Sequence, residues 1–370
     1  MVHIKNYVKT INTLSGLSVR IVYFDNLHYD GQELREVEKP HVDNQFSNFL
    51  TYKTFLLSKL TQIRDNATSF MRKMPMSLLS TISTGYDSVA VSALVQSVGV
   101  SEALTFKRSR GGYLSMGGKD DSGTTIAQYL GLRTISGRRD SFKKAPDAEI
   151  DFFCFDPDGE DTNFATFRDH LTKRMPVVLF TGFNGDKVWD IHRHNVSPEI
   201  VRGDTTGLGL CEFRLRAGFV HCPVPFIGIL DAGAIYQISN SIELKPWSLG
   251  NDYDRPICRR IAEEAGVPRD KFGVHKKATS ILYESPIVPS NKSARRSFYT
   301  YLLERKVCTA KYLILIKFIR VANRFIDPFQ AGYWRIRRKT FSKIKSRIDG
   351  LTFPWAAYQC KSGYRKYGEK

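Results

Sequence analysis

The chain lacks the sequence features that mark secreted, disulfide-rich and membrane-spanning proteins. Its six cysteines form no CxxC pair and follow no ordered Cys/His spacing, so we expect buried reduced thiols rather than a disulfide framework or a zinc site. Residues 1–14 contain no continuous apolar run of the kind found in secretory signals, and no later stretch reaches about 18 uncharged apolar residues. These absences predict a cytoplasmic protein.

Low-complexity segments and internal repeats are also absent from the 370 residues. The composition, with 42% hydrophobic and 25% charged residues, is typical of a folded globular protein. A chain of this length has room for about two or three domains. We divide it into an N-terminal region with a lead-in helix at residues 1–70, a main domain at residues 71–290, and a basic, mostly helical tail at residues 291–370.

Acidic residues are scarce relative to basic ones, which leaves a net charge of +18. Half of this excess lies in residues 311–350, where eleven basic residues and two acidic ones leave a net of nine. Large apolar side chains alternate there with the cations, a pattern that suits a helix on an anionic membrane surface. The pattern also suits an RNA backbone, with Tyr333 and Trp334 available for base stacking. A packed helix with a solvated basic face is the third interpretation.

Hydrophobic periodicity predicts an α/β fold. Residues 47–71 carry apolar side chains at helical spacing, which predicts a helix leading into the main domain. Short apolar runs predict strands at residues 77–82, 103–106, 132–136 and 177–180, with helices beginning near Asp87, Ser122, Thr162 and Asp186. Residues 149–155 are predicted to form a further strand or an extended loop. This alternation predicts a doubly wound parallel sheet, with ligand-binding loops at the carboxyl ends of the strands.

The most informative segment is LLSTISTGYDSVAVSALV at residues 78–95, in which an apolar strand, a tight polar turn and an apolar helix follow one another. Small residues at the turn allow successive backbone N–H groups to face a phosphate, and the helix N-terminus adds partial positive charge. Ser83, Thr84 and Ser88 carry hydroxyl donors, and Asp87 is suited to holding Mg²⁺ against phosphate oxygens. An ordinary helix cap is the alternative, because Ser, Thr and Asp favour helix starts.

Residues 83–88 (STGYDS) resemble the Ser-Gly-Gly-x-Asp-Ser loop of the ATP pyrophosphatases, a family that includes asparagine synthetase, GMP synthetase and tRNA lysidine synthase. The resemblance implies a doubly wound domain of the adenine nucleotide alpha hydrolase type, with ATP and Mg²⁺ as cofactors. The residues that it implies at the nucleotide are Ser83, Thr84, Gly85, Tyr86, Asp87, Ser88, Phe106, Thr181 and Gly182.

Two further segments add to this resemblance. The segment LFTGFNGDKVWD at residues 179–190 is similar to Leu-Ser-Gly-Glu-Gly-Ser-Asp-Glu of asparagine synthetase, which makes Asp186 the second metal ligand beside Asp87; a plain strand-to-helix turn is the alternative. Residues 252–278, from DYDRP to HKKA, resemble the C-terminal part of the same synthetase domain. There Lys276 or Lys277 takes the position of a phosphate-binding lysine, with a solvated basic loop as the alternative. The implied catalytic residues are therefore Asp87, Asp186, Lys276 and Lys277.

Some positions depart from the family pattern. Thr84 replaces a glycine of the loop, where its side chain is expected to crowd the pyrophosphate or strain the turn. Phe183 stands in place of a glutamate that is associated with amination in asparagine synthetase, and Lys187 in place of an acid. Residues 1–70 begin Met-Val and are too few for a glutaminase domain with its N-terminal cysteine. We therefore expect nitrogen from a separate glutaminase subunit, free ammonia or another nucleophile.

Two smaller clusters stand apart from these motifs. The spacing of His192 and His194 favours metal binding less than ordinary exposure to solvent. The acidic cluster Asp156, Asp158, Glu160 and Asp161 predicts an exposed loop, or a loop near the substrate, because loops carry function.

The expected function is ATP-dependent ligation. The chain would adenylate a carboxyl or carbonyl oxygen of a small-molecule or glycan-precursor acceptor, release pyrophosphate and transfer nitrogen to the acceptor. One alternative is modification of a tRNA base by the same activation, and another is a degenerate nucleotide-binding scaffold without turnover. The cytoplasmic location extends to the membrane periphery if the basic tail binds lipid.

Overall fold

The computed structural model describes residues 10–12, 15–20, 22, 25–38, 40, 44, 46–107, 121–155, 160–194, 196–198, 213–274, 287–306, 308–309, 313–314 and 350–365. Several residues from the sequence analysis lie outside this part of the chain. They are Lys276 and Lys277, the acidic residues Asp156 and Asp158, Cys211, and nearly all of the basic segment at residues 311–350.

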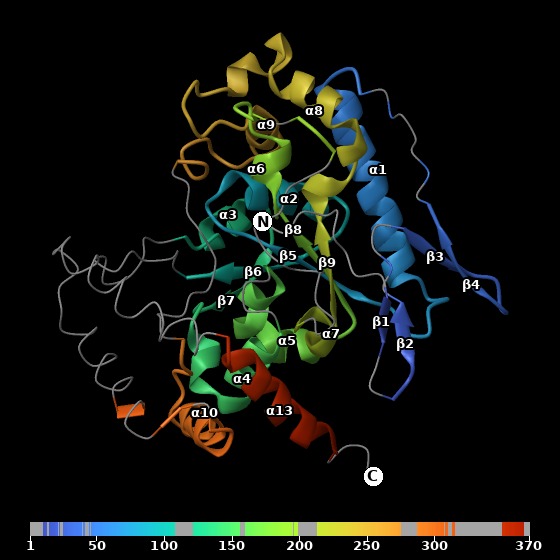
Figure 1. Ribbon diagram of the computed structural model, residues 1–370. Coiled ribbons are helices and arrows are strands. Elements are labelled where there is room, and N and C mark those ends of the chain that lie inside the picture. The colour runs from blue at the N-terminus through green and yellow to red at the C-terminus, as the bar shows by residue number, and fades with distance from the viewer. Residues whose placement is uncertain are drawn as a thin grey trace.

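The centre of the molecule is a sheet of five parallel strands in the order β7-β6-β5-β8-β9 (Figure 1). The strands are β5 (Ser77–Thr81), β6 (Glu102–Phe106), β7 (Arg133–Gly137), β8 (Val177–Thr181) and β9 (Phe219–Pro223). The predicted α/β fold with a parallel sheet is confirmed, as are its first four strands. Hydrophobic periodicity did not predict β9, because its sequence FVHCP has polar residues within it and ends in proline, as edge strands often do.

The order of the strands reverses direction between β5 and β8, at the middle of the sheet. The chain adds β6 and β7 on one side of β5 and then returns to add β8 and β9 on the other side. All five strands are parallel, so the loops after β5 and β8 leave the same edge of the sheet and diverge. Open α/β sheets bind ligands at such a divergence.

Helices surround the sheet (Figure 1). The α-helices are α1 (Phe49–Thr68), α2 (Tyr86–Ser97), α3 (Thr124–Tyr129), α4 (Pro146–Cys154), α5 (Arg168–Thr172), α6 (Gly185–Val188), α7 (Phe213–Ala217), α8 (Ala232–Ser239), α9 (Pro256–Glu264), α10 (Lys292–Glu304) and α13 (Thr352–Arg365). Shorter 3₁₀ helices are η2 (Ser141–Lys144), η3 (Glu160–Phe167), η4 (Val224–Phe226), η5 (Ile229–Asp231) and η6 (Ile242–Trp247). Two antiparallel hairpins precede α1 and pair β1 (Thr10–Asn12) with β2 (Ser18–Arg20) and β3 (Asn26–Tyr29) with β4 (Leu34–Val37).

The predicted lead-in helix is α1, and its start is determined locally. The Asn48 side chain accepts a hydrogen bond from the Thr51 N–H at 2.9 Å, and the Thr51 hydroxyl accepts one from the Asn48 N–H at 3.2 Å. This reciprocal capping box satisfies two N–H groups that the helix leaves without intrahelical partners. The face of α1 that packs on the main core buries Phe49, Tyr52, Leu56 and Leu60.

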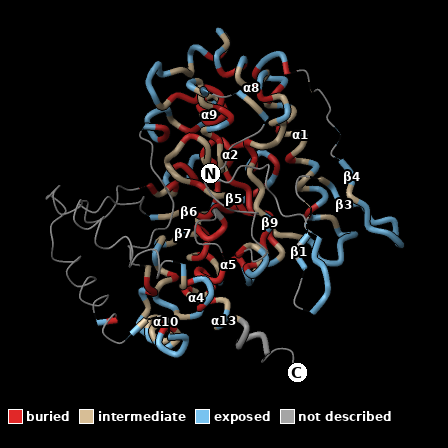
Figure 2. Tube along the Cα trace, viewed as in Figure 1, coloured by how far each residue is buried: buried red, intermediate tan, exposed pale blue. Residues whose placement is uncertain are grey.

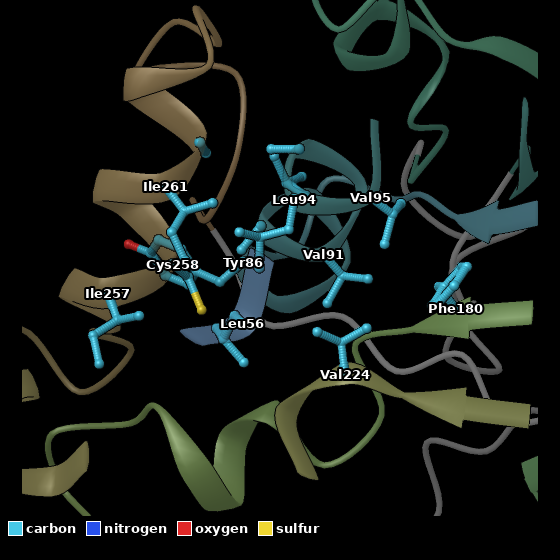
Figure 3. Packing of buried hydrophobic residues seen from close by; sticks show 14 of the residues in the cluster. Leu56, Tyr86, Val91, Leu94, Val95, Phe180, Val224, Ile257, Cys258 and Ile261 are labelled. Atoms are coloured by element: carbon cyan, nitrogen blue, oxygen red, sulfur yellow. The ribbon is translucent and has the colours of Figure 1, made fainter. Parts of the chain in front are cut away.

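Two hydrophobic cores lie on opposite faces of the sheet, and Figure 2 shows buried residues along its strands and on the helices beside them. Side chains alternate along β8: Val178 and Phe180 enter one core, whereas Val177 and Leu179 enter the other. The first core includes residues of α1, α2, α8 and α9 (Figure 3), and the second includes residues of α4, α7, α10 and α13. The sheet is therefore the middle layer between two layers of helices.

The prediction for residues 149–155 is wrong, because this segment forms helix α4 and the residue after it. Pro146 occupies the first turn, where its missing N–H costs nothing, and Asp147 and Glu149 follow in that turn, where their charges suit the helix dipole. Phe152 and Phe153 are both buried, since α4 packs against Phe142 on one side and against α13 on the other. Burial on two sides produced an apolar run that resembled a strand.

The predicted helix starts are otherwise close to the observed ones. Helix α2 begins one residue before Asp87, α6 one residue before Asp186, and α3 two residues after Ser122. Thr162 instead lies in the 3₁₀ helix η3, and the α-helix that follows begins at Arg168. In the described part of the chain, no helix combines the length and apolarity needed to cross a membrane.

Candidate functional site

The turn between β5 and α2 is held together by its own hydroxyl groups. The hydroxyls of Ser83 and Ser88 lie 2.7 Å apart, and the Ser88 hydroxyl also accepts the Ser83 N–H at 3.1 Å. The Ser83 hydroxyl in turn accepts the Gly85 N–H at 3.1 Å. The N-cap residue of α2 is Gly85, which has no side-chain cap bond, so the hydroxyl bonds at this helix start come from Ser83 and Ser88 on either side of it. The serines hold the backbone N–H groups of the turn in one arrangement.

Thr84 is accommodated in this turn without strain. It does not adopt a positive φ, the region in which a glycine is favoured. Its hydroxyl donates to the carboxylate of Asp121 at 2.7 Å, and its N–H points to the same oxygen at 3.3 Å. Asp121 is buried, and the Thr84 carbonyl accepts the Gly273 N–H at 2.9 Å. The expectation of a strained turn at this position is therefore wrong, and the threonine connects the loop to two distant segments.

The loops after β5 and β8 meet through two glycines that face Asp87. A Cβ atom at Gly182 would lie 2.6 Å from the carbonyl carbon of Asp87, and one at Gly185 would lie 2.5 Å from its Oδ1 atom. Neither position has room for a side chain. Asn184, between them, adopts the left-handed region with φ 58° and turns the chain into α6. The two segments that sequence analysis assigned to one site, residues 83–88 and 181–186, therefore lie together at the divergence of the sheet.

Asp87 pairs with an arginine that the sequence analysis did not single out. Arg255, whose side chain is 3% exposed, donates to Oδ2 of Asp87, and its Nε lies 3.5 Å from Oδ2 of Asp190. The thiol of Cys258 lies 3.7 Å from Oδ1 of Asp87. Arg255 directly precedes α9, so the packing of α9 against α2 delivers the guanidinium to the loop. Arg255 is the arginine of the DYDRP motif. Its contact with Asp87 could not be predicted from the motif, because it depends on how α9 packs on α2.

Several charges act on Asp87. Burial raises the pKa of the Asp87 carboxyl, the Arg255 charge and hydrogen bond oppose that rise, and the charge of Asp186 adds to it. The contribution of Asp186 places the two predicted metal ligands within electrostatic reach of each other. The Arg255 guanidinium thus faces the carboxylates of Asp87 and Asp190, and the charge of Asp186 acts on Asp87 from nearby.

Asp87 and Asp186 are the residues that could hold a magnesium ion. Two carboxylates supply the hard oxygen ligands that Mg²⁺ prefers, and the repulsion between Asp87 and Asp186 is one that a cation would relieve. Among the described residues no three His, Cys, Asp or Glu side chains converge on a protein-only metal site. Magnesium needs no such cage when phosphate oxygens and water complete its shell.

Tyr86 points away from the loop and into the core. Its side chain is fully buried, and its hydroxyl accepts a hydrogen bond from Arg259. Its ring lies 4.8 Å from that of Tyr253 and 5.9 Å from that of Phe272. Figure 3 shows Tyr86 beside Cys258, in the contact between α2 and α9. Of the residues assigned to the nucleotide, Tyr86 therefore presents only its backbone at the turn.

Phe106 and Thr181, the other predicted residues that the structure describes, end neighbouring parts of the same edge of the sheet. Phe106 ends β6, and its ring is 5.1 Å from that of Phe167 with Arg139 above it. Thr181 ends β8, and its hydroxyl is 2.7 Å from Nε2 of His221 on β9, a partner that the sequence analysis missed. His221 comes from the strand that periodicity did not predict, so no local signal identified it.

No protein-family model and no curated protein matches the sequence.

Proposed function

We propose that the chain is an ATP-dependent ligase that binds the nucleotide phosphates at the turn between β5 and α2. The observation that carries this proposal is the contact between the two strand-end loops, in which Gly182 and Gly185 leave no space between themselves and Asp87. A hydroxyl-rich turn and a pair of carboxylates thereby come together where an open α/β sheet binds ligands. The strand order supports the finer proposal of a doubly wound domain of the adenine nucleotide alpha hydrolase type.

Phosphate oxygens would replace the internal partners of the turn. The N–H groups of Ser83 and Gly85 donate to serine hydroxyls only two to five residues away, and such local bonds exchange readily for an anion. The same hydroxyls can then donate to the phosphates. Mg²⁺ held by Asp87 and Asp186 would offset the charge that gathers on pyrophosphate as it leaves. Arg255 would keep Asp87 ionised and oriented.

The proposed reaction has two steps. A carboxylate or carbonyl oxygen of the acceptor attacks the α-phosphorus of ATP, and the bond to pyrophosphate breaks. A nitrogen nucleophile then attacks the activated carbon, loses a proton and displaces AMP. We propose a small molecule or glycan precursor as the acceptor, with nitrogen from free ammonia or a separate glutaminase subunit. We propose a cytoplasmic location, in solution or at the membrane surface.

The test separates phosphate recognition from adenosine recognition. Isothermal titration measures the affinity of wild type and of Ser83→Ala for ATP with Mg²⁺ and for adenosine. We expect the substitution to weaken ATP binding about tenfold, the effect of one hydrogen bond to a charged group, and to leave adenosine binding unchanged. Ser97→Ala is the control, because this serine bonds to Leu94 at the far end of α2.

Equal losses for the two ligands would contradict phosphate binding at the turn. Pyrophosphate release in the presence of candidate acceptors then separates the ligase from the alternative of a nucleotide-binding scaffold. ATP binding without release of pyrophosphate, for any acceptor tried, would favour the scaffold.

A further inference from the structure

Thr181, His221 and Asp161 contact one another in a row beside the loop that follows β8. Nε2 of His221 lies 2.7 Å from the Thr181 hydroxyl, and Nδ1 of the same ring lies 3.3 Å from Oδ1 of Asp161. The side chains of His221 and Asp161 are each 3% exposed. Three elements, η3, β8 and β9, each supply one member, so the set exists only in the folded chain.

The chemistry of this set is directional. A carboxylate beside Nδ1 favours a proton on that nitrogen, which leaves Nε2 of a neutral ring to accept the hydroxyl proton of Thr181. With its proton so engaged, the Thr181 oxygen is free to accept, and the Phe183 N–H points to it at 3.4 Å. Donation therefore runs from the Phe183 N–H to Thr181 and from the Thr181 hydroxyl to His221, whose other ring nitrogen faces the Asp161 carboxylate.

The other groups around the ring reinforce this order. Arg214 on α7 lies 3.7 Å from Oδ2 of Asp161, so the carboxylate faces a cation as well as the imidazole. The rings of Phe164 and Phe183 lie 6.1 and 5.6 Å from that of His221 and limit the access of water. Buried polar and charged contacts in apolar surroundings are worth more than the same contacts in water.

The end of this set is next to the proposed nucleotide site. Phe183 lies between Gly182 and Asn184, the residues that turn the chain into α6. Gly182 and Gly185 contact Asp87, and Asp186 follows in the first turn of α6. A loop that holds two glycines against a carboxylate has little freedom, and the bond to the Phe183 N–H is one contact that fixes it.

We propose that Asp161 and His221 are positioning residues of the nucleotide site, which orient the Thr181 hydroxyl and through it the loop that carries Gly182 and Asp186. This inference rests on the proposed function for its effect on ATP. Asp161, from the acidic cluster of the sequence, is thus a buried residue that acts on the site through His221 and Thr181.

The experiment is a double-mutant cycle with two readouts. Thr181→Val and His221→Phe each remove one side of the central contact, and both are combined in one chain. Hydrogen exchange of the Phe183 amide, without ligand, reports on the loop, and isothermal titration with ATP and Mg²⁺ reports on the site. We expect each single variant to speed exchange and to weaken ATP binding about tenfold, and the double variant to be no worse than either.

Conservative variants and matched controls separate this role from general destabilisation. Thr181→Ser keeps the hydroxyl, and His221→Gln keeps a side-chain amide that can reach it, so both should retain affinity within about twofold of wild type. The matched controls are Thr68→Val and His170→Gln, on α1 and α5. These controls should leave exchange at Phe183 unchanged.

The outcomes are distinct. Additive effects in the double variant, or wild-type affinity for ATP in Thr181→Val and His221→Phe, would overturn the positioning role. If the wild-type chain binds no ATP while exchange at Phe183 follows the cycle, the proposed function falls and the positioning of the loop stands.

Discussion

Asp87 is the residue on which most contacts of the candidate site converge. It accepts a hydrogen bond from Arg255, contacts the backbone of Gly182 and Gly185, and is within electrostatic reach of Asp186. Variants of its neighbours Arg255 and Gly185 test how Asp87 affects the stability of the fold and the proposed binding of ATP.

Replacing Arg255 with methionine should destabilise the fold in a pH-dependent manner. Loss of one partner of a buried pair leaves Asp87 uncompensated beside Asp186 and is expected to cost about 3–5 kcal/mol at neutral pH. The folded-state pKa of Asp87 is already raised above its ordinary value, and the variant raises it further. For a raised carboxyl pKa, stability is highest while the group is protonated and falls as pH rises through the folded-state value.

The deficit of Arg255→Met relative to wild type should therefore be larger at pH 7 than near pH 4. Urea unfolding at these two pH values measures it, with the exposed Arg72→Met as the control. A deficit of equal size at both pH values would show that Arg255 acts through packing rather than through its charge.

Gly185→Ala tests the contact between the two loops. The new Cβ atom would lie 2.5 Å from Oδ1 of Asp87, so the carboxylate or the loop must move. We expect a loss of about 1–3 kcal/mol in the free energy of unfolding and a clear loss of ATP affinity, measured by urea unfolding and titration. The matched control is Gly233→Ala in α8, where no heavy atom lies within 4 Å of the added Cβ. There the helix should gain about 0.5–1 kcal/mol. Similar behaviour of the two variants would argue against close packing at Asp87.

At the scale of elements, the described parts of the C-terminal region belong to the second core. Helix α13 packs on α4, and its Trp355 is fully buried, with its indole N–H donating to the Ser297 hydroxyl at 3.2 Å. The Trp355 ring lies 5.3 Å from that of Phe298 on α10. These helices therefore cover apolar surface of the main α/β domain.

Trp355→Ala should cost about 3–5 kcal/mol of unfolding free energy, since it removes a large buried ring and leaves a cavity. Urea denaturation measures this loss, and the exposed Phe353→Ala on the same helix is the control, because that ring is 46% exposed. If the two substitutions cost the same, α13 does not dock as described. ATP affinity of folded Trp355→Ala should be unchanged, because the Trp355 ring packs on Phe153 of α4 and Phe298 of α10 rather than on the turn at residues 83–88.

At the scale of the whole molecule, the net charge of +18 is the dominant property. Residues 311–350 supply half of it, and all eleven of their basic residues lie outside the described part of the chain, so their partner stays a prediction. Cations that alternate with large apolar side chains favour a lipid surface, since burial of apolar area adds to charge attraction there.

We expect full-length protein to sediment with vesicles that contain phosphatidylserine. Arg335, Arg337 and Arg338, replaced together by glutamine, should weaken this binding by roughly 3 kcal/mol, about one for each cation near the surface. The control replaces three exposed basic residues, Arg35, Arg72 and Lys73, by glutamine and so removes the same charge elsewhere on the surface. Equal effects of the two triple variants would indicate nonspecific attraction. A gel shift with total tRNA that falls steeply with salt, without vesicle binding, would identify RNA as the partner instead.

The sequence by itself determined the elements whose signals are local. Residues 78–95 run from a short apolar segment through a polar turn to a second apolar segment, so the strand, the turn and the helix of the candidate site were predictable from adjacent residues. The parallel sheet followed from the repetition of this rhythm. The capping box at Asn48 and Thr51 likewise depends on residues only three positions apart.

Only the tertiary structure decided the partners of these residues. Arg255 and Asp87 are separated by 168 positions, and Thr181 and His221 by 40, so no periodicity connects them. Strand β9 and helix α4 were missed or misread because their side chains follow the surfaces that cover them rather than an intrinsic pattern. Charges and hydroxyls at long sequence separation meet only when helices and strands dock, and docking depends on the shape of the whole core.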